Sequence, residues 1–239
     1  MPYHASLMGE ESVTDVVVMT VGQHDLGVLP KIGSPPELGL FRTRRGSCEY
    51  DVREYGERAL GWLADLSRHT DPKRFAVDYE LPIADKVLRH LEQRGEAVGR
   101  LVLLGTDQED RDYRHTDTLP IAEFVEHLMR LRGHPSEVEV LGIHGDPTDH
   151  LAVFHQVHAL LPTILGGAAG GAARRVVIAT AGGTPAVGAV VALVFALVGA
   201  GQVDAWRMGE VEVGEVRVSR SGVVEPRGFG EVLAALGVA

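Results

Sequence analysis

The stretch from residue 176 to residue 199 constrains the fold more than any other part of the chain. Residues 176–179 are apolar and mostly β-branched, residues 180–185 read TAGGTP, and residues 186–199 carry no charge. A short apolar run, paired glycines and a proline in the first helical position predict a strand, a tight turn and a helix. Units of this kind, repeated along a chain, build parallel sheets covered by helices.

The rest of the chain repeats this alternation. Short apolar runs predict strands over residues 15–20, 100–105, 138–143 and 203–208. Apolar residues three or four apart predict helices over residues 52–68, 82–94, 118–132, 149–161 and 230–236. Residues 211–218 alternate apolar and polar side chains, as a half-exposed strand or hairpin does. We therefore expect an α/β fold, Rossmann-like, with a mainly parallel sheet, helices on both faces and an antiparallel C-terminal edge.

One domain accounts for nearly the whole chain. We expect an N-terminal extension over residues 1–14 and a single Rossmann-like domain over residues 15–239. Residues 29–50 are rich in Pro, Gly and Arg without a period, which predicts an insertion or a long loop. Residues 166–173 contain only glycine and alanine, so a flexible connection is expected there.

The net charge of -10 and the single Cys48 exclude several classes of protein. An acidic chain does not bind duplex nucleic acid non-specifically, and one cysteine cannot build a disulfide framework or a cysteine zinc site. The N-terminus is polar and holds Glu10 and Glu11 where a signal peptide would be basic and then apolar, so we expect a cytoplasmic protein. No charge occurs between Arg175 and Asp204, but the glycine turn leaves too few residues for a membrane span.

Three predicted strands end in short polar turns. Carboxyl ends of parallel strands share one edge of a sheet, so these turns would supply hydroxyls, amides and backbone N–H groups to one crevice for a sugar or a phosphate. The alternative is that polar residues only end these strands. The predicted ligand-binding residues are Thr20, Gly22, Gln23, Asp25, Thr106, Asp107, Gln108, Thr180, Gly182, Gly183 and Thr184.

Familiar nucleotide and metal motifs are missing. The chain has no GxGxxG, and its glycine turn lacks the lysine of a P-loop, which disfavours a dehydrogenase or a nucleoside triphosphatase. Among His150, His155 and His158, only the last two have the spacing of one helix face, and no carboxylate stands at a fitting position. We therefore expect no metal and no cofactor.

The three polar turns together carry a family resemblance. The first is Thr20-Val21-Gly22, the second is 105–108 with Asp117-Thr118 opening the next helix, and the third is 180–185. This combination resembles the CARF family, the CRISPR-associated Rossmann-fold sensors of cyclic oligoadenylates in type III antiviral signalling. The resemblance runs from about residue 15 to residue 208. It implies a homodimer that binds one ring across its two-fold axis, through the turn after the first strand and the glycine turn of each subunit.

The chain departs from that family in two places. Many members carry a lysine after GGT, where this chain has Pro185, so phosphate contact from that position would come from backbone amides or from elsewhere. The GGTP form is similar to that of the type III-A effector ribonucleases, which add a HEPN ribonuclease domain with an Arg-x4-6-His motif. Residues 209–239 are too few for that domain and contain no histidine. The resemblance is therefore to a stand-alone sensor.

Three functions remain open at this point. The first is a cyclic oligoadenylate-binding protein with metal-independent ring nuclease activity, in which Thr20, His24 and Thr184 are the candidate catalytic residues. His24 is included because an imidazole titrates in the range that suits proton transfer. The second is a non-catalytic sensor that regulates a partner chain. The third is a Rossmann-like enzyme that acts on another nucleotide or a sugar phosphate.

Overall fold

The computed structural model describes residues 12–26, 52–69, 81–108, 114–134, 136–166, 175–199, 212–215, 217–219 and 222–224. The predicted insertion at 29–50, the strand at 203–208 and the helix at 230–236 lie outside the described residues, as does the glycine-alanine connection beyond Gly166. The first strand begins at Ser12, three residues inside the expected N-terminal extension.

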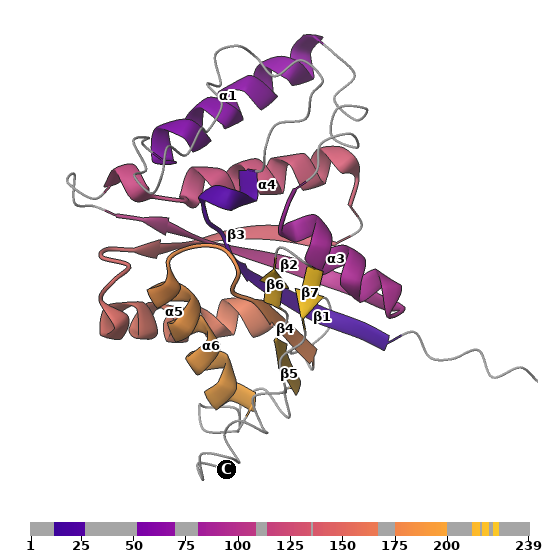
Figure 1. Cartoon of the computed structure of the whole chain (residues 1–239), viewed down its shortest axis with the longest axis vertical. Coiled ribbons are helices and arrows are strands. Elements are labelled where there is room, and N and C mark those ends of the chain that lie inside the picture. Colours follow the sequence, from indigo (N-terminus) through magenta and orange to yellow (C-terminus); the bar gives the residue numbers. More distant parts are fainter. Residues whose placement is uncertain are drawn as a thin grey trace, which may run out of the picture.

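A parallel sheet of five strands forms the centre of the fold (Figure 1). Every neighbouring pair in it is parallel, in the order β3-β2-β1-β4-β5. The strands are β1 (Ser12–Thr20), β2 (Glu96–Asp107), β3 (Glu137–His144), β4 (Arg175–Ala179) and β5 (Glu212–Glu215). The predicted Rossmann-like α/β class is confirmed.

The described residues do not show the expected antiparallel edge of this sheet. β5 pairs with β4 in parallel, and the antiparallel pairing that the structure describes is a separate hairpin of β6 (Arg217–Ser219) and β7 (Gly222–Val224). Alternation of apolar and polar residues reports that one face of a strand is exposed, and it carries no information on the direction of the neighbour. The helix between β4 and β5 returns the chain so that β5 runs parallel to β4.

Helices cover both faces of the sheet (Figure 1). Three pack on one face with Val17 and Met19, and two pack on the other with Val16 and Val18, because alternate residues of β1 point to opposite sides. The first group is α1 (Val52–His69), α3 (Ala84–Gln93) and α4 (Leu119–Arg132). The second is α5 (His150–Gly166) and α6 (Pro185–Gly199). Short 3₁₀ turns lie at η1 (Gln23–Leu26) and η2 (Arg114–Thr116).

The strand order reverses between β1 and β4. From β1 the chain builds outward through β2 to β3, and it then crosses to build β4 and β5 on the opposite side. The helices that follow β1 and β4 therefore lie on opposite faces of the sheet. In open α/β sheets, ligands bind beyond the carboxyl ends of the strands at such a switch point. The two turns of interest here are those after Thr20 and after Ala179.

The uncharged helix α6 is covered mainly by its own chain. Val187, Val191, Val194 and Phe195 are fully buried against α5 and the sheet, whereas Leu193 is 49% exposed. Helix α5 packs against α6 and covers apolar side chains of α6 that the sheet does not reach. No helix in the described ranges is long and apolar enough to cross a membrane.

Candidate functional site

The turns after β1 and β4 interlock at the switch point. The Thr20 hydroxyl donates a hydrogen bond of 2.5 Å to the Gly182 carbonyl, so the end of β1 holds the glycine turn directly. On the other side, the Val21 N–H donates to the Leu104 carbonyl at 2.9 Å, which ties the same turn to β2. The backbone after β1 is thus fixed between its two neighbouring strands.

Glycines allow the two turns to approach each other closely. A Cβ at Gly22 would lie 2.3 Å from the Gly183 nitrogen, and a Cβ at Gly182 would lie 2.2 Å from the Thr20 oxygen. Gly183 itself has φ of +76°, which favours glycine. From the sequence pattern, these glycines were expected to let the backbone approach a ligand. In the structure, Gly22 and Gly182 are needed where the two turns pack backbone against backbone.

A buried carboxyl group lies beneath both turns. Asp25 Oδ2 accepts the Gly22 N–H at 2.7 Å and would lie 2.5 Å from a Cβ at Gly182. Burial raises the pKa of Asp25 to about 7, and the hydrogen bond from Gly22 opposes that rise. The protonated and ionised forms therefore coexist near neutral pH, directly under the backbone of both glycine turns.

The glycine turn leads into α6 as expected. The Thr184 hydroxyl accepts the Val187 N–H at 3.3 Å, in the position of an N-cap, and Pro185 is the first helical residue. Thr180 is half-buried, and Ala181 is exposed at the outside of the turn. The hydroxyls of two predicted catalytic residues, Thr20 and Thr184, are thus both engaged within the chain.

The other two residues of the first predicted turn lie in η1. Gln23 and His24 have described backbones, and their side chains lie outside the description. The structure brings the backbone at Thr20, Gly22 and Asp25 together with Gly182 and Gly183. Whether they bind a ligand stays a prediction.

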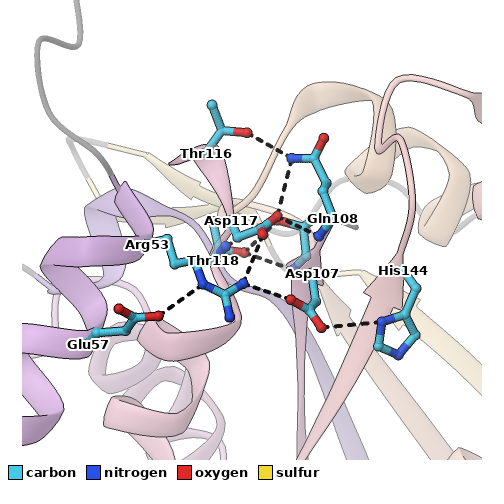
Figure 2. A network of polar contacts seen from close by, with 9 residues as sticks. Arg53, Glu57, Asp107, Gln108, Thr116, Asp117, Thr118 and His144 are labelled. Atoms are coloured by element: carbon cyan, nitrogen blue, oxygen red, sulfur yellow. Dashed lines mark hydrogen bonds and ion pairs between the residues drawn. The ribbon is translucent and has the colours of Figure 1, made fainter. Parts of the chain in front are cut away.

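A second polar group lies one strand further along the same edge, at the ends of β2 and β3 (Figure 2). Its centre is Arg53 in the first turn of α1. The guanidinium donates to Asp107 Oδ1 at 2.7 Å, to Asp117 Oδ2 at 3.0 Å and to Glu57 Oε1 at 2.9 Å. These carboxylates raise the pKa of Arg53 above its ordinary value, with Asp107 the largest cause. One cation therefore joins α1, the end of β2 and the start of α4.

Asp117 is the buried member of this group. Its side chain is fully buried, and Oδ1 accepts the Gln108 N–H at 2.9 Å and the Gln108 side-chain amide at 3.2 Å. Burial raises the pKa of Asp117, while the hydrogen bonds from Gln108 and Arg53 oppose the rise. The Thr106 N–H donates to the Thr118 hydroxyl at 3.0 Å, so the Thr118 side chain ties the end of β2 to the start of α4 and makes no capping bond to the helix.

His144 closes the network at the end of β3. Its Nδ1 lies 3.5 Å from Asp107 Oδ2, the oxygen that Arg53 does not contact. Gln156 of α5 accepts the His144 N–H at 2.7 Å and donates its own amide back to the His144 carbonyl. The imidazole is therefore attached to a backbone that is held on both sides, while the ring itself is 60% exposed.

No protein-family model matches this sequence, and no curated protein matches it.

The residues predicted at the end of the second strand lie at the carboxyl edge of the sheet. Thr106, Asp107 and Gln108 lie at the predicted edge, but their polar groups bond mainly to Thr118, Arg53 and Asp117. Within the part of the chain that the structure describes, no three His, Cys, Asp or Glu side chains are placed to hold a metal ion. The edge as described offers a glycine turn at the switch point and, two strands away, a histidine beside a carboxylate.

Arg53 and His144 were not among the predicted site residues, although the sequence carried a signal for each. An arginine in the first turn of a helix opposes the helix dipole, so it needs a local acidic partner. His144 follows the run 138–143, which was predicted as a strand, and the rule applied to three strand ends applies equally to this fourth one.

Proposed function

We propose that this chain is a CARF-like sensor that binds a cyclic oligoadenylate, with phosphate groups seated against the interlocked turns after β1 and β4. The observation that carries the proposal is the position of the glycine turn. It follows β4 at the switch point of a parallel sheet and opens directly into α6. Ligands of such sheets bind there, and the positive end of the α6 dipole favours an anion.

The absence of charge in α6 supports a backbone-mediated contact. None of its residues, Pro185–Gly199, is charged, so no side chain of the helix offsets the positive end of its dipole. A lysine is not needed for phosphate contact when backbone amides are directed at the ligand. A turn with Pro185 in place of lysine can therefore bind phosphate through its backbone, even in a chain whose net charge is -10.

The finer parts of the proposal follow from the resemblance. The chain acts in the cytoplasm, within type III antiviral signalling, as a homodimer that shares one ring between two subunits. Leu193 and Ala189 are exposed apolar residues of α6 and are the proposed contacts with the second copy. Light scattering tests this point, since Leu193→Arg should yield folded monomers, whose circular dichroism spectrum matches that of the wild type and whose thermal midpoint no longer depends on protein concentration.

Ligand binding is tested by placing a negative charge on the proposed phosphate seat. Ala181 is exposed in the glycine turn, and Ala97 is exposed at the opposite end of the sheet, so Glu at either position should leave the fold intact. Calorimetry with cyclic tetra-adenylate and cyclic hexa-adenylate should show binding to the wild type. Ala181→Glu should weaken it at least tenfold, or about 1.4 kcal/mol, and Ala97→Glu should not.

Two outcomes would reject the proposal. If neither ring binds the wild type but a mononucleotide or a sugar phosphate does, the chain is a Rossmann-like protein for another ligand. If a ring binds and Ala181→Glu binds it equally well, the ligand lies elsewhere. If the wild type binds the ring without cleaving it, the chain is a non-catalytic regulator. The predicted catalytic roles of Thr20, His24 and Thr184 are then wrong.

A further inference from the structure

His144 and Asp107 form an oriented pair at the exposed carboxyl edge of the sheet. They end neighbouring strands, and they are direct partners in the register of β2 and β3. His144 Nδ1 faces Asp107 Oδ2 at 3.5 Å, and Figure 2 shows the ring directed at that carboxylate. A histidine whose Nδ1 is paired with a carboxylate presents Nε2 as a proton acceptor. Such contacts are often long before substrate is bound.

Two features beyond Asp107 bear on where the imidazole lies. Gln156 binds both the N–H and the carbonyl of the His144 backbone. Gly142 leaves room for the ring, because a Cβ there would lie 3.1 Å from His144 Cε1 and 3.2 Å from Nε2. An exposed ion pair contributes little to stability. A gain in stability therefore does not explain why this exposed ring lies beside Asp107.

Asp107 is itself held from behind. Its Oδ1 accepts from Arg53, which also contacts the fully buried Asp117. The two oxygens of Asp107 therefore face two different partners, a fixed cation on one side and the imidazole on the other. A carboxylate in this arrangement can orient a histidine and stabilise the imidazolium that forms when it takes up a proton.

We propose that His144 is the proton-transfer residue of a ring-cleaving activity and that Asp107 is its positioning residue, an inference that rests on the proposed function. In this step Nε2 takes the proton of a ribose 2′-hydroxyl, and the 2′-oxygen bonds to the adjacent phosphorus. The bond from phosphorus to the 5′-oxygen breaks, a water molecule gives a proton to that oxygen, and the imidazolium returns its proton to the solvent. The products are a 2′,3′-cyclic phosphate and a 5′-hydroxyl.

The position of His144 fits a ligand larger than one nucleotide. β3 lies two strands from β1 in the sheet, and neighbouring strands are about 4.8 Å apart, so the imidazole is about 10 Å along the edge from the switch point. A ring held by its phosphates at the glycine turns would reach this residue with another of its nucleotides. His144 therefore supplies the proton transfer, while the turns supply binding.

The experiment measures ring binding and ring cleavage on the same variants. Calorimetry gives affinity, and single-turnover conversion in excess EDTA, followed by chromatography, gives the cleavage rate. His144→Ala should slow cleavage at least 100-fold and change affinity less than twofold, with partial recovery in added imidazole. Asp107→Asn should slow cleavage about tenfold. His127→Ala, an exposed histidine on α4, is the matched control and should behave as the wild type.

Nitrogen NMR of the imidazole tests the pair without any ligand. The wild type should hold the proton of neutral His144 on Nδ1, and Asp107→Asn should lose that preference. Absence of the preference in the wild type, or His144→Ala that cleaves as fast as the wild type, overturns the inference. A wild type that binds the ring and leaves it intact overturns it too, and the sensor proposal stands. A wild type that binds no ring overturns both.

Discussion

The two polar regions at the carboxyl edge of the sheet are built in different ways. At the switch point, backbone packs against backbone, and a Cβ at Gly22 or Gly182 would lie within 2.5 Å of main-chain atoms of the other turn. At the ends of β2 and β3, charged side chains make the connections, and Arg53 alone contacts three carboxylates. The first region depends on glycines that carry no side chain, and the second depends on charged side chains.

This difference predicts how each region responds to change. Main-chain atoms cannot move away from an added methyl group without shifting a strand or a turn, so the switch point should be intolerant of any side chain at its glycines. Ion pairs that are partly exposed can be lost at a smaller cost. The predictions below test that contrast, from the largest expected effect to the smallest.

Gly182→Ala should cause the largest loss of stability. The added Cβ would lie 2.2 Å from the Thr20 oxygen and 2.5 Å from Asp25 Oδ2, so both turns must shift. We expect the free energy of unfolding to fall by about 4 kcal/mol, above the usual cost of overpacking, because the added Cβ meets main-chain atoms. Urea denaturation measures the change. An unchanged midpoint would mean that the two turns do not pack as described.

Asp25 should make the switch point sensitive to pH. Because its pKa is about 7 in the folded chain and near 4 when unfolded, the folded state holds the proton more tightly. The resulting stabilisation is complete below about pH 4 and is lost as pH rises to about 7. Asp25→Asn removes this dependence, so the wild type should lose on the order of 3 kcal/mol relative to the variant between pH 5 and pH 8. Parallel urea curves at the two pH values measure it, and a constant difference would contradict the burial of Asp25.

Arg53→Met should cost about 2 kcal/mol, less than the glycine change. The loss arises because Asp117 remains fully buried without its cationic partner. Arg58→Met is the matched control on the same helix, since Arg58 is exposed and pairs only with the exposed Glu54 in the described contacts. Denaturation of both variants gives the comparison, and equal losses would show that burial of Asp117 does not distinguish the two arginines.

Gly61→Ala should have the smallest effect, of opposite sign. Gly61 lies inside α1, and a Cβ there would meet nothing within 4 Å. Alanine favours the helix, so stability should rise by about 0.7 kcal/mol. Thermal unfolding of Gly61→Ala and of Gly182→Ala shows whether the two glycines differ as described. A loss of stability in Gly61→Ala would contradict the open space at Gly61.

Periodicity predicted the elements of this fold well where one local rule determines them. The run 176–179 with TAGGTP gave β4, its turn and the start of α6, because strand, glycine and proline signals all act within a few residues. The direction of β5 could not be predicted, since alternation reports exposure alone. The direction in which a strand pairs depends on how the segment before it carries the chain back to the sheet.

The contacts of the candidate site were predicted only in part, because they too depend on segments far apart in the sequence. Strand ends could be recognised in sequence, so Thr20, Asp107 and Gly182 were placed at the correct edge. The partners of those residues come from distant segments, and the sequence distance from Arg53 to Asp117 is 64 residues. Local patterns also cannot separate a glycine needed for ligand approach from one needed for packing, as at Gly22.

The most direct test of the ligand site is hydrogen exchange with and without the ring that calorimetry shows to bind. If the ligand sits at the switch point, amide exchange should slow in peptides that cover residues 20–26 and 181–188, and exchange at 96–99, at the opposite end of β2, should not change. Protection confined to other segments, or no change in either turn while the ring is bound, would contradict the account.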